Sequence, residues 1–296
     1  MKKMLLTINN LNVKYGKTMA LNITTPINIE KGDRIGVIGS NGAGKTTLIN
    51  SLLGIVNYTG SIDSAITPAD MAVHMQFNEY TDSMSVKHIM EAVLQTNIKK
   101  NLKLRELISF FEFENCLNKR YKVLSGGQKQ RFTIILVMMQ EAPLTFYDEV
   151  TSGLDFETRQ KLVEKLVSWY QDKESALCVI SHYYEELEQL ANKLLILEQG
   201  NVIAFGHKDD LFKKYCGRAI IIIDNNEKNQ LLTSKYSKLA APNHSIVLTC
   251  NDQEIEAEIT SSLIQNNVNY KRSNNDIEMI FINAKNHVVL GGARNE

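Results

Sequence analysis

The stretch RIGVIGSNGAGKTT, residues 34–47, decides the fold class of this chain. It opens with the apolar run RIGVIG, which ends in glycine, as expected of a strand buried on both faces of a sheet. The next residues satisfy the pattern G-x-x-x-x-G-K-[ST] and lead into a helix predicted near residues 46–53. A chance match to these four fixed positions is on the order of one in a hundred in a chain of this length. The sequence therefore predicts an α/β domain with a phosphate-binding loop, and an ordinary glycine-rich turn is the weaker interpretation.

This loop has the composition needed to hold the phosphates of a nucleotide. Glycines allow backbone N–H groups to turn inward around an anion, and the N-terminus of the following helix adds a favourable dipole. Lys45 is expected to reach the β- and γ-phosphates of ATP, and the hydroxyl of Thr46 is expected to bind Mg²⁺. The predicted nucleotide-binding residues of the loop are Gly39, Ser40, Asn41, Gly42, Ala43, Gly44, Lys45, Thr46 and Thr47.

Two further apolar strands are followed by polar residues. LTFY (144–147) leads into Asp148 and Glu149, and His182 follows soon after ALCVI (176–180). Because ligands of open α/β sheets lie beyond the carboxyl ends of the strands, these residues should converge on the phosphate loop. Asp148 is then predicted to serve Mg²⁺, and Glu149 to polarise an attacking water. Taken alone, His182 would more often be a polar cap, but in this company it is a candidate ligand of the γ-phosphate.

A second glycine-rich loop lies further along the chain, in VLSGGQKQR (123–131). A helix should begin here, because the apolar residues that follow share one helical face and a serine at its start can act as an N-cap. Two glycines again expose backbone N–H groups at a helix start, so the loop has the features of a second anion site. A simple capped helix would explain the serine, but a chance match to LSGGQ is on the order of one in a few thousand. The predicted residues are Ser125, Gly126, Gly127 and Gln128.

The composition limits the classes of protein that fit. The 296 residues include 33 Lys and Arg against 33 Asp and Glu, so the formal charge is zero and no overall basic field favours nucleic acid. The four cysteines form no Cys-x-x-Cys pair, which indicates a reducing compartment rather than a disulfide or zinc framework. No apolar run approaches the roughly 18 residues of a membrane span, so any membrane function is expected to depend on another chain.

The pattern along the chain predicts two domains. We assign residues 1–216 to a nucleotide-binding domain, with antiparallel strands in residues 1–33 and a helical insert at about 85–124. The composition then shifts, and residues 217–296 are predicted to form a small accessory or regulatory α/β domain. Its predicted elements are a strand in AIIIID (219–224), a possible helix in NEKNQLLTSKYSKL (226–239), a strand in SIVLTC (245–250), a helix in EIEAEITSSLIQNN (254–267) and a final element in DIEMIFINA (276–284).

The motif LSGGQ, lying between the phosphate loop and the acidic strand end, resembles the signature of the ABC ATPases. The order of the other elements agrees with that family over residues 1 to about 215. The resemblance implies a mixed sheet core with an antiparallel β subdomain and a helical subdomain. In that family, the signature loop of one subunit caps the γ-phosphate of ATP held by the phosphate loop of the other. It therefore implies a head-to-tail dimer that sandwiches two ATP molecules, with ATP and Mg²⁺ as cofactors.

The same resemblance implies roles for individual residues. Tyr15 matches the aromatic residue that stacks on adenine, and Gln76 matches the glutamine that binds Mg²⁺ and senses the γ-phosphate. Glu149 matches the catalytic glutamate, and His182 matches the switch histidine. Asp155 ends the SGLD loop, which matches the segment that connects the two sites across the dimer. Without the family, Tyr15 would equally well be a core or surface residue, and Gln76 would be a solvated loop residue.

Two positions depart from the family pattern. Val150 occupies a position where the family usually has proline, and Tyr147 directly precedes Asp148. Both departures are mild and leave every catalytic group in place. A homodimer of this chain could therefore contain two competent sites.

The leading hypothesis is the ATP-hydrolysing subunit of a membrane transporter, held at the cytoplasmic face of the membrane by separate permease chains and paired with an identical or homologous second ATPase subunit. An ATPase domain followed by a small α/β tail resembles bacterial exporters of drugs, antimicrobial peptides or toxins, although importer subunits can also carry C-terminal domains.

The alternative is a soluble mechanochemical ABC ATPase acting on ribosomes or DNA. Those proteins usually fuse two cassettes or insert a long coiled coil, and a neutral chain gains little from counterion release, so no nucleic-acid partner is expected. A nucleotide sensor without turnover is disfavoured because Glu149 and His182 are both present.

Overall fold

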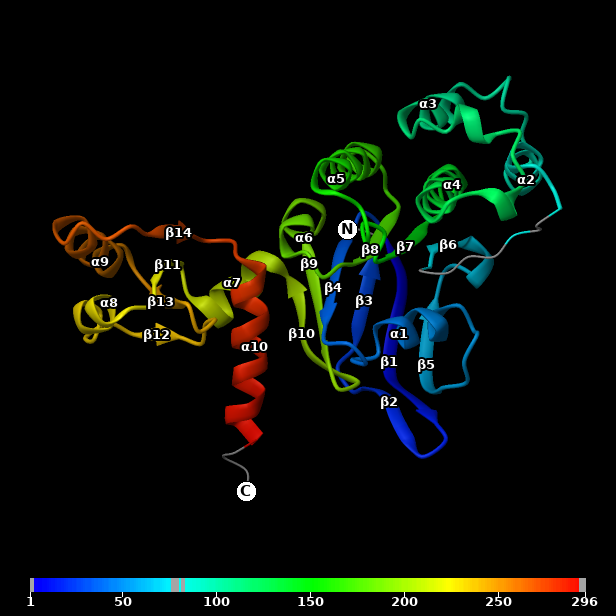
Figure 1. Cartoon of the computed structure of the whole chain (residues 1–296). Coiled ribbons are helices and arrows are strands. Elements are labelled where there is room, and N and C mark those ends of the chain that lie inside the picture. Colours follow the sequence, from blue (N-terminus) through cyan, green and yellow to red (C-terminus); the bar gives the residue numbers. More distant parts are fainter. Residues whose placement is uncertain (1–2, 76–79, 81–82, 293–296) are drawn as a thin grey trace.

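A computed structural model of the chain describes residues 3–75, 80 and 83–292 (Figure 1). These residues form two sheets, a large one that carries the phosphate loop and a small one formed after residue 216. The predicted α/β fold class is confirmed, and the two sheets lie side by side in Figure 1 with helix α10 between them.

Within the described residues, the large sheet has ten strands in the order β3-β1-β2-β10-β9-β4-β8-β7-β6, and β5 pairs with β1. The strands are β1 (Met4–Tyr15), β2 (Thr18–Ile23), β3 (Ile27–Glu30), β4 (Arg34–Gly39), β5 (Thr59–Ser64), β6 (Met71–His74), β7 (Leu144–Asp148), β8 (Ala176–Ile180), β9 (Lys193–Glu198) and β10 (Asn201–His207). Neighbours from β9 through β4, β8 and β7 to β6 run parallel, whereas β1 pairs antiparallel with β2, β3 and β5. The sheet thus joins a parallel core to an antiparallel N-terminal part, as the pattern of residues 1–33 predicts.

Alternate residues of the central strands pack on opposite faces of the large sheet. Ile35 and Val37 of β4 belong to the apolar cluster that contains helix α1 (Lys45–Leu52), whereas Ile38 belongs to the cluster on the other face. Each fully buried side chain of this kind stabilises the fold by about 1.5–3 kcal/mol. Burial on both faces explains why this strand is an unbroken apolar run in the sequence.

The remaining helices of this part pack around the sheet or form the insert. The α-helices are α2 (Val86–Val93), α3 (Leu102–Phe110), α4 (Gly126–Gln140), α5 (Phe156–Tyr170), α6 (Tyr184–Leu190) and α7 (Lys208–Cys216), and the short 3₁₀ helices are η1 (Pro68–Asp70), η2 (Glu114–Cys116) and η3 (Tyr121–Val123). Helices α2 and α3 stand away from the sheet beside α4 (Figure 1). The rings of Tyr80 and Tyr121 lie 5.1 and 5.6 Å from that of Phe132 in α4, so aromatic packing holds the insert to this helix. These helices α2 and α3, with η2 and η3, fall within the residues 85–124 predicted for the insert.

The small sheet has the order β12-β13-β11-β14, and every neighbouring pair is antiparallel. Its elements are β11 (Ala219–Asp224), α8 (Glu227–Leu232), β12 (Lys238–Leu239), β13 (Ser245–Cys250), α9 (Gln253–Gln265) and β14 (Lys271–Ser273). This β-α-β-β-α-β order with the last strand beside the first is the split βαβ arrangement. The possible helix over residues 226–239 is only half right. Helix α8 ends at Leu232. The next residue, Thr233, is buried, its hydroxyl donates to the carbonyl of Asn229, and the chain then leads toward β12.

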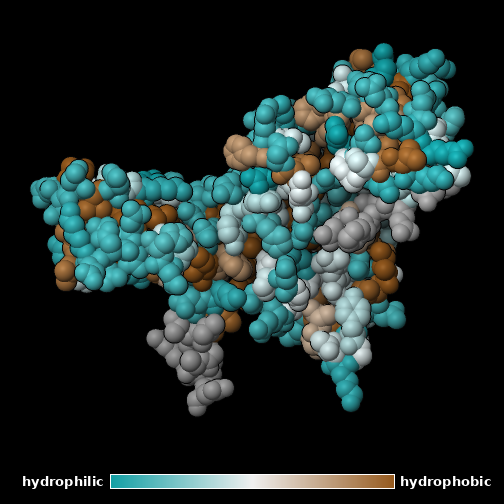
Figure 2. Space-filling view, in the orientation of Figure 1, coloured by the Kyte–Doolittle hydropathy of each residue, from teal (hydrophilic) through white to brown (hydrophobic). Residues whose placement is uncertain are grey.

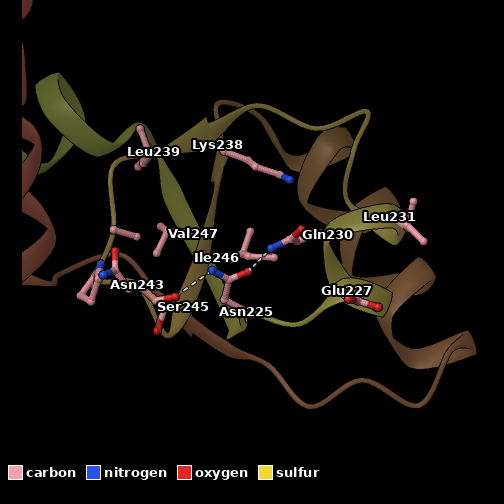
Figure 3. A pocket seen from close by; sticks show the side chains of 12 residues that line it. Asn225, Glu227, Gln230, Leu231, Lys238, Leu239, Asn243, Ser245, Ile246 and Val247 are labelled. Carbon is pink, nitrogen blue, oxygen red and sulfur yellow. Dashed lines mark hydrogen bonds between the residues drawn. The ribbon is translucent and has the colours of Figure 1, made fainter.

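An open hollow of about 730 Å³ lies beside β12, β13 and α8 on the small sheet (Figure 3). Gln230 donates to Asn225 at 2.7 Å, and Asn225 donates to the carbonyl of Asn243 at 2.7 Å. These amides therefore satisfy one another along the wall of the hollow.

The last described element is helix α10 (Ile277–Gly292), which leaves the small sheet and packs on α7, α6 and β10 (Figure 1). Ile280 and Ala284 are fully buried and belong to the same apolar cluster as the helices packed on the large sheet. The sequence predicts an element here but not its return to the large sheet.

Two further expectations concern the cysteines and the membrane. All four cysteines are free and buried, and burial raises the pKa of Cys250 to about 11, so this thiol stays protonated at neutral pH. Across the described ranges, none of the helices combines the length and apolar character needed to cross a bilayer.

Candidate functional site

The phosphate loop occupies the connection between β4 and α1, where backbone space is tight. A Cβ atom on Gly39 would lie 2.3 Å from the carbonyl oxygen of Leu197, and one on Gly44 would lie 2.5 Å from the side chain of Leu21. Gly44 also has a φ of 99°, which side chains rarely adopt. The fold of this chain therefore requires glycine at both positions.

Lys45 begins helix α1 and turns back over the loop. Its Nζ donates to the carbonyl oxygens of Gly39 at 2.8 Å and Ser40 at 3.1 Å. Burial lowers the pKa of Lys45, and the charges of Glu149, Asp148 and Glu198 oppose this change. The ammonium group thus lies at the mouth of the loop, beside the free N–H groups of the first helical turn.

The end of β7 brings a carboxylate to the start of α1. The Thr46 hydroxyl donates to Asp148 Oδ2 at 3.1 Å, and Asp148 is buried. Burial raises the pKa of this carboxyl, while the hydrogen bond from Thr46 opposes the shift. The two oxygen donors fit Mg²⁺, which is usually bound through one or two carboxylates together with substrate phosphates and water. Among the described residues, no group of three or more His, Cys, Asp or Glu side chains could hold a metal ion by itself.

Glu149 and His182 meet beside this pair. His182 Nε2 lies 2.9 Å from Glu149 Oε1; the side chain of His182 is exposed and that of Glu149 is partly exposed. Glu149 has a φ of 50°, a left-handed conformation that is uncommon for residues other than glycine and recurs at functional sites. Its N–H bonds to the carbonyl of Ile180 at 3.0 Å, which ties the end of β7 to the end of β8. The strand ends therefore converge as the sequence predicts.

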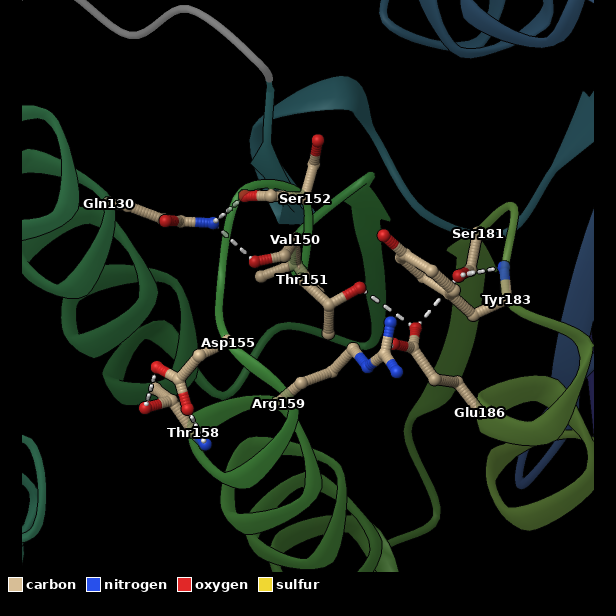
Figure 4. A network of polar contacts seen from close by, with 10 residues as sticks. All are labelled: Gln130, Val150, Thr151, Ser152, Asp155, Thr158, Arg159, Ser181, Tyr183 and Glu186. Atoms are coloured by element: carbon tan, nitrogen blue, oxygen red, sulfur yellow. Dashed lines mark hydrogen bonds and ion pairs between the residues drawn. The ribbon is translucent and has the colours of Figure 1, made fainter.

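A buried carboxylate connects the loops that follow these two residues (Figure 4). Glu186 Oε2 accepts hydrogen bonds from the hydroxyls of Thr151 at 2.9 Å and Ser181 at 2.7 Å. Arg159 lies 3.5 Å from Glu186 Oε1 and covers the ring of Tyr183 with its guanidinium 3.9 Å from the ring centroid. Burial raises the pKa of Glu186, and these hydrogen bonds oppose the shift. One side chain thus ties the loop after Glu149 to the loop that carries His182.

The second glycine-rich loop forms the N-terminus of α4. Ser125 accepts from the N–H of Gln128 at 3.3 Å, and Gln128 accepts from the N–H of Ser125 at 3.1 Å, which is a capping box. Gly126 and Gly127 are exposed, and a Cβ atom on either would meet nothing within 4 Å beyond its own helix turn. In the same helix, Gln130 donates to the carbonyl of Val150 (Figure 4).

Three predicted residues remain to be placed, namely Asp155, Tyr15 and Gln76. Asp155 caps α5 by accepting from Thr158, and hydrogen bonds from that residue lower its pKa. Asp155 and Gly127 line one hollow of about 290 Å³, so the SGLD loop and the second glycine loop are neighbours. Tyr15 is half-exposed at the end of β1. Gln76 lies outside the described residues.

The sequence analysis missed Glu186 and its partners. A signal was available, because Glu186 lies four residues before Leu190 and next to Leu187, on the face of α6 that is buried. A carboxylate at an apolar position of a short helix indicates a buried partner. The partners Thr151, Ser181 and Arg159 carry no such mark.

The phosphate loop, the carboxylate beside Thr46 and the Glu149–His182 pair define the class of this protein as a P-loop nucleoside triphosphatase. The family model described as ABC transporter matches residues 24–152. Its solved relatives support the same fold. The ATP-binding subunit of an ABC transporter has a TM-score of 0.63 at 23% identity and covers 71% of this chain and 93% of its own. The structure of cbiO1 from Clostridium perfringens has a TM-score of 0.59 at 22% identity, over 72% of this chain and 92% of its own.

Curated relatives of similar sequence are also named as ATP-binding proteins of transport or resistance systems. Nod factor export ATP-binding protein I of Cupriavidus pinatubonensis is 28% identical over 77% of this chain and 74% of its own length. Methionine import ATP-binding protein MetN of Clostridium tetani is 29% identical over 75% and 76%. Linearmycin resistance ATP-binding protein LnrL of Bacillus subtilis is 27% identical over 87% and 86%. The family model over residues 24–152 and these curated relatives therefore support an ATP-binding subunit of an ABC transporter, a class of subunit that is an ATPase coupled to transport.

Proposed function

We propose that this chain drives a membrane exporter and that it works in a head-to-tail dimer of ATPase subunits with two sandwiched ATP molecules. The observation that carries the proposal is the convergence of three strand ends on the phosphate loop. Thr46 reaches Asp148 at 3.1 Å, and His182 reaches Glu149 at 2.9 Å. A binding-only protein would have no need for a carboxylate held in a left-handed conformation beside a histidine.

In the proposed reaction, the phosphate loop binds the triphosphate through its backbone N–H groups and Lys45. Glu149 orients the attacking water and accepts its proton, since its partly exposed carboxylate directly follows β7 and can be reached by water. His182 stands beside Glu149 as the candidate ligand of the γ-phosphate.

A divalent cation completes the proposed site. Thr46 and Asp148 would hold Mg²⁺, with Gln76 as the third protein ligand expected from the family resemblance. When bound, Mg²⁺ supplies positive charge to the β- and γ-phosphate oxygens. Asp148 suits this role because its buried carboxyl gains a compensating charge.

The dimer is proposed from the second glycine loop. Gly126 and Gly127 meet no atoms of their own chain beyond their helix turn, so a reason for glycine there lies outside the chain. A nucleotide on the partner subunit supplies that reason, since exposed N–H groups at a helix start bind phosphate. Ser125 and Gln128 flank these glycines, and Asp155 lies beside them to connect the two sites. Tyr15 would stack on the adenine held by its own chain.

The direction of transport is proposed from the relatives. The Nod factor relative is named for export, and the linearmycin relative is named for resistance, which fits removal of a toxic compound. The linearmycin match covers 87% of this chain. The proposed nucleotide-binding domain, residues 1–216, is 73% of the 296 residues, so this match extends beyond it. The methionine import relative covers 75%. We assign residues 217–296 to an accessory domain on the same basis.

The membrane partners are proposed to be permease chains that hold this subunit at the cytoplasmic face. Figure 2 shows a mainly hydrophilic surface over both the helical insert and the small sheet, with apolar side chains among the polar ones in each. The exposed apolar residues of and next to the insert are Met84, Val93, Leu102, Phe110 and Val123. We propose that the permease chains contact the insert through these exposed apolar residues.

The experiment that tests this function is purification of the tagged chain from detergent-solubilised cells, followed by identification of its partners. Multi-span membrane chains in equal amounts are expected. Inside-out vesicles that contain the complex should then take up the transported compound when given Mg-ATP, as an exporter would. Ribosomal or DNA-bound partners without a membrane chain would instead support the soluble mechanochemical alternative.

A further inference from the structure

The phosphate loop has a polar neighbour outside the strand ends described above. The hydroxyl of Ser40 donates to Glu198 Oε2 at 3.1 Å, and Glu198 is the last residue of β9. The turn that follows is fixed to the same loop, because the N–H of Gly200 donates to the carbonyl of Ala43 at 3.1 Å. Glu198 is therefore held against the phosphate loop by the sheet itself.

A carboxylate in this position opposes nucleotide binding unless it is neutralised. The triphosphate of ATP is strongly anionic, and like charges repel over several ångströms where solvent is partly excluded. The side chain of Glu198 is only 16% exposed, so water screens its charge incompletely. Its charge also acts on Lys45, the cation that the phosphates need.

The neutralising cation comes from the C-terminal helix. Lys285 Nζ lies 2.7 Å from Glu198 Oε1. Helix α10 is held in place independently of this ion pair, since Ile280 and Ala284 are fully buried and the ring of Phe281 lies 6.2 Å from that of Tyr184 in α6. Lys285 is thus presented to the phosphate loop by a docked helix.

We propose that Lys285 is a positioning residue for ATP binding: it neutralises Glu198 and leaves Lys45 free for the nucleotide phosphates. This role rests on the proposed function of the phosphate loop. It gives the C-terminal segment a direct influence on the affinity for ATP, because a shift of α10 away from β10 would expose the loop to an unpaired carboxylate.

The test is the affinity of the purified full-length protein for Mg-ATP, measured by isothermal titration calorimetry alongside ATPase kinetics. Lys285→Met keeps most of the aliphatic stem and removes the charge, so the Kd and KM for ATP should rise about fivefold while kcat stays unchanged. Adding Glu198→Gln to this variant should restore the affinity, because the unpaired carboxylate is then gone. The matched control is Lys235→Met, which breaks the Lys235–Glu258 pair of the same C-terminal segment and should bind ATP like the wild type.

Two results would overturn the proposal. Wild-type affinity in Lys285→Met would show that the lysine has no influence on the site. A loss that persists in the Lys285→Met/Glu198→Gln double variant would show that the ion pair serves only the docking of α10. Lys45→Ala belongs in the same titration series. If it abolishes ATP binding, the phosphate-loop assignment stands whatever Lys285 does, whereas unchanged binding would show that the proposed function itself fails.

Discussion

The two glycine-rich loops of this protein have similar sequences and different surroundings. In the phosphate loop, a side chain on Gly39 would collide with the backbone at Leu197. In the second loop, Gly126 and Gly127 face open space. The fold therefore requires glycine in the phosphate loop. In the second loop, nothing within the same chain requires it.

The difference separates a glycine that its own chain requires from glycines that the chain itself does not require. Glycine within a helix lowers stability by about 1 kcal/mol relative to alanine, so two glycines in the first turn of α4 weaken the fold without a gain inside the chain. In the proposed dimer, the phosphate loop is complete within one subunit, whereas the second loop acts only against the partner's nucleotide. Substitutions in each loop and beside it test this contrast.

The largest effect is expected for Glu149→Gln. Removing the base should lower ATP turnover about a thousandfold while ATP binding is retained. The second loop should then stay closed on its partner's nucleotide, so light scattering should show a dimer when ATP is present. In the Glu149→Gln/Gly127→Leu double variant, the leucine side chain should keep the subunits apart. Normal hydrolysis by the single variant would mean that another group is the base.

Lys45→Ala should lower the affinity for ATP about a hundredfold, because two charge-assisted hydrogen bonds to phosphate are lost. The loss should occur in the monomer, since the phosphate loop is complete within one chain. This loss of affinity is measured by calorimetry at a protein concentration too low for the subunits to dimerise. Binding that weakens only in the dimer would contradict the contrast between the loops.

A smaller effect is expected on the free energy of unfolding, which substitutions in the two loops should change in opposite directions. Gly39→Ala should lower the free energy of unfolding by about 3 kcal/mol, because its Cβ would lie 2.3 Å from a backbone oxygen and the sheet must shift. Gly127→Ala should raise it by about 0.5–1 kcal/mol through helix propensity. Urea unfolding of both variants gives the comparison, and equal losses would show that the second loop is also constrained by its own chain.

The smallest effect concerns Glu186, which ties the two catalytic loops together. Because burial raises its pKa in the folded state, the wild type should gain stability relative to Glu186→Gln as the pH falls through that raised pKa toward the ordinary value near 4.3. Urea unfolding between pH 4 and 8 measures this difference. At neutral pH, the variant should lose about tenfold in kcat with an unchanged KM, because the loops that carry Glu149 and His182 lose their common acceptor. A pH-independent difference would mean that the carboxyl does not titrate in this range.

The sequence predicts best where burial determines composition. Strands β4, β7 and β8 are covered on both faces and therefore form continuous apolar runs, and the residues that end them converge as expected. β5 carries no such mark, because its side chains are exposed and it is held by backbone pairing with β1. The packing of α10 on α7, α6 and β10 could not be predicted either, since an apolar helix face does not specify which distant surface will cover it.

Long-range polar contacts were the other source of failure. Glu198 reads as a solvated turn residue, and Lys285 as a surface lysine, because 87 residues separate them in the chain. The Glu186 network likewise joins residues from three segments. Such pairs depend on the completed tertiary structure, and local pattern carries no record of them.

The return of α10 to the large sheet has a consequence during synthesis. The segment around Ser40 leaves the ribosome early, whereas Lys285 emerges 245 residues later. A nascent chain can therefore assemble its nucleotide pocket long before the neutralising helix exists. On the ribosome, ATP should be held weakly until translation passes α10, so that a truncated chain would compete poorly with finished subunits for the nucleotide and for a partner.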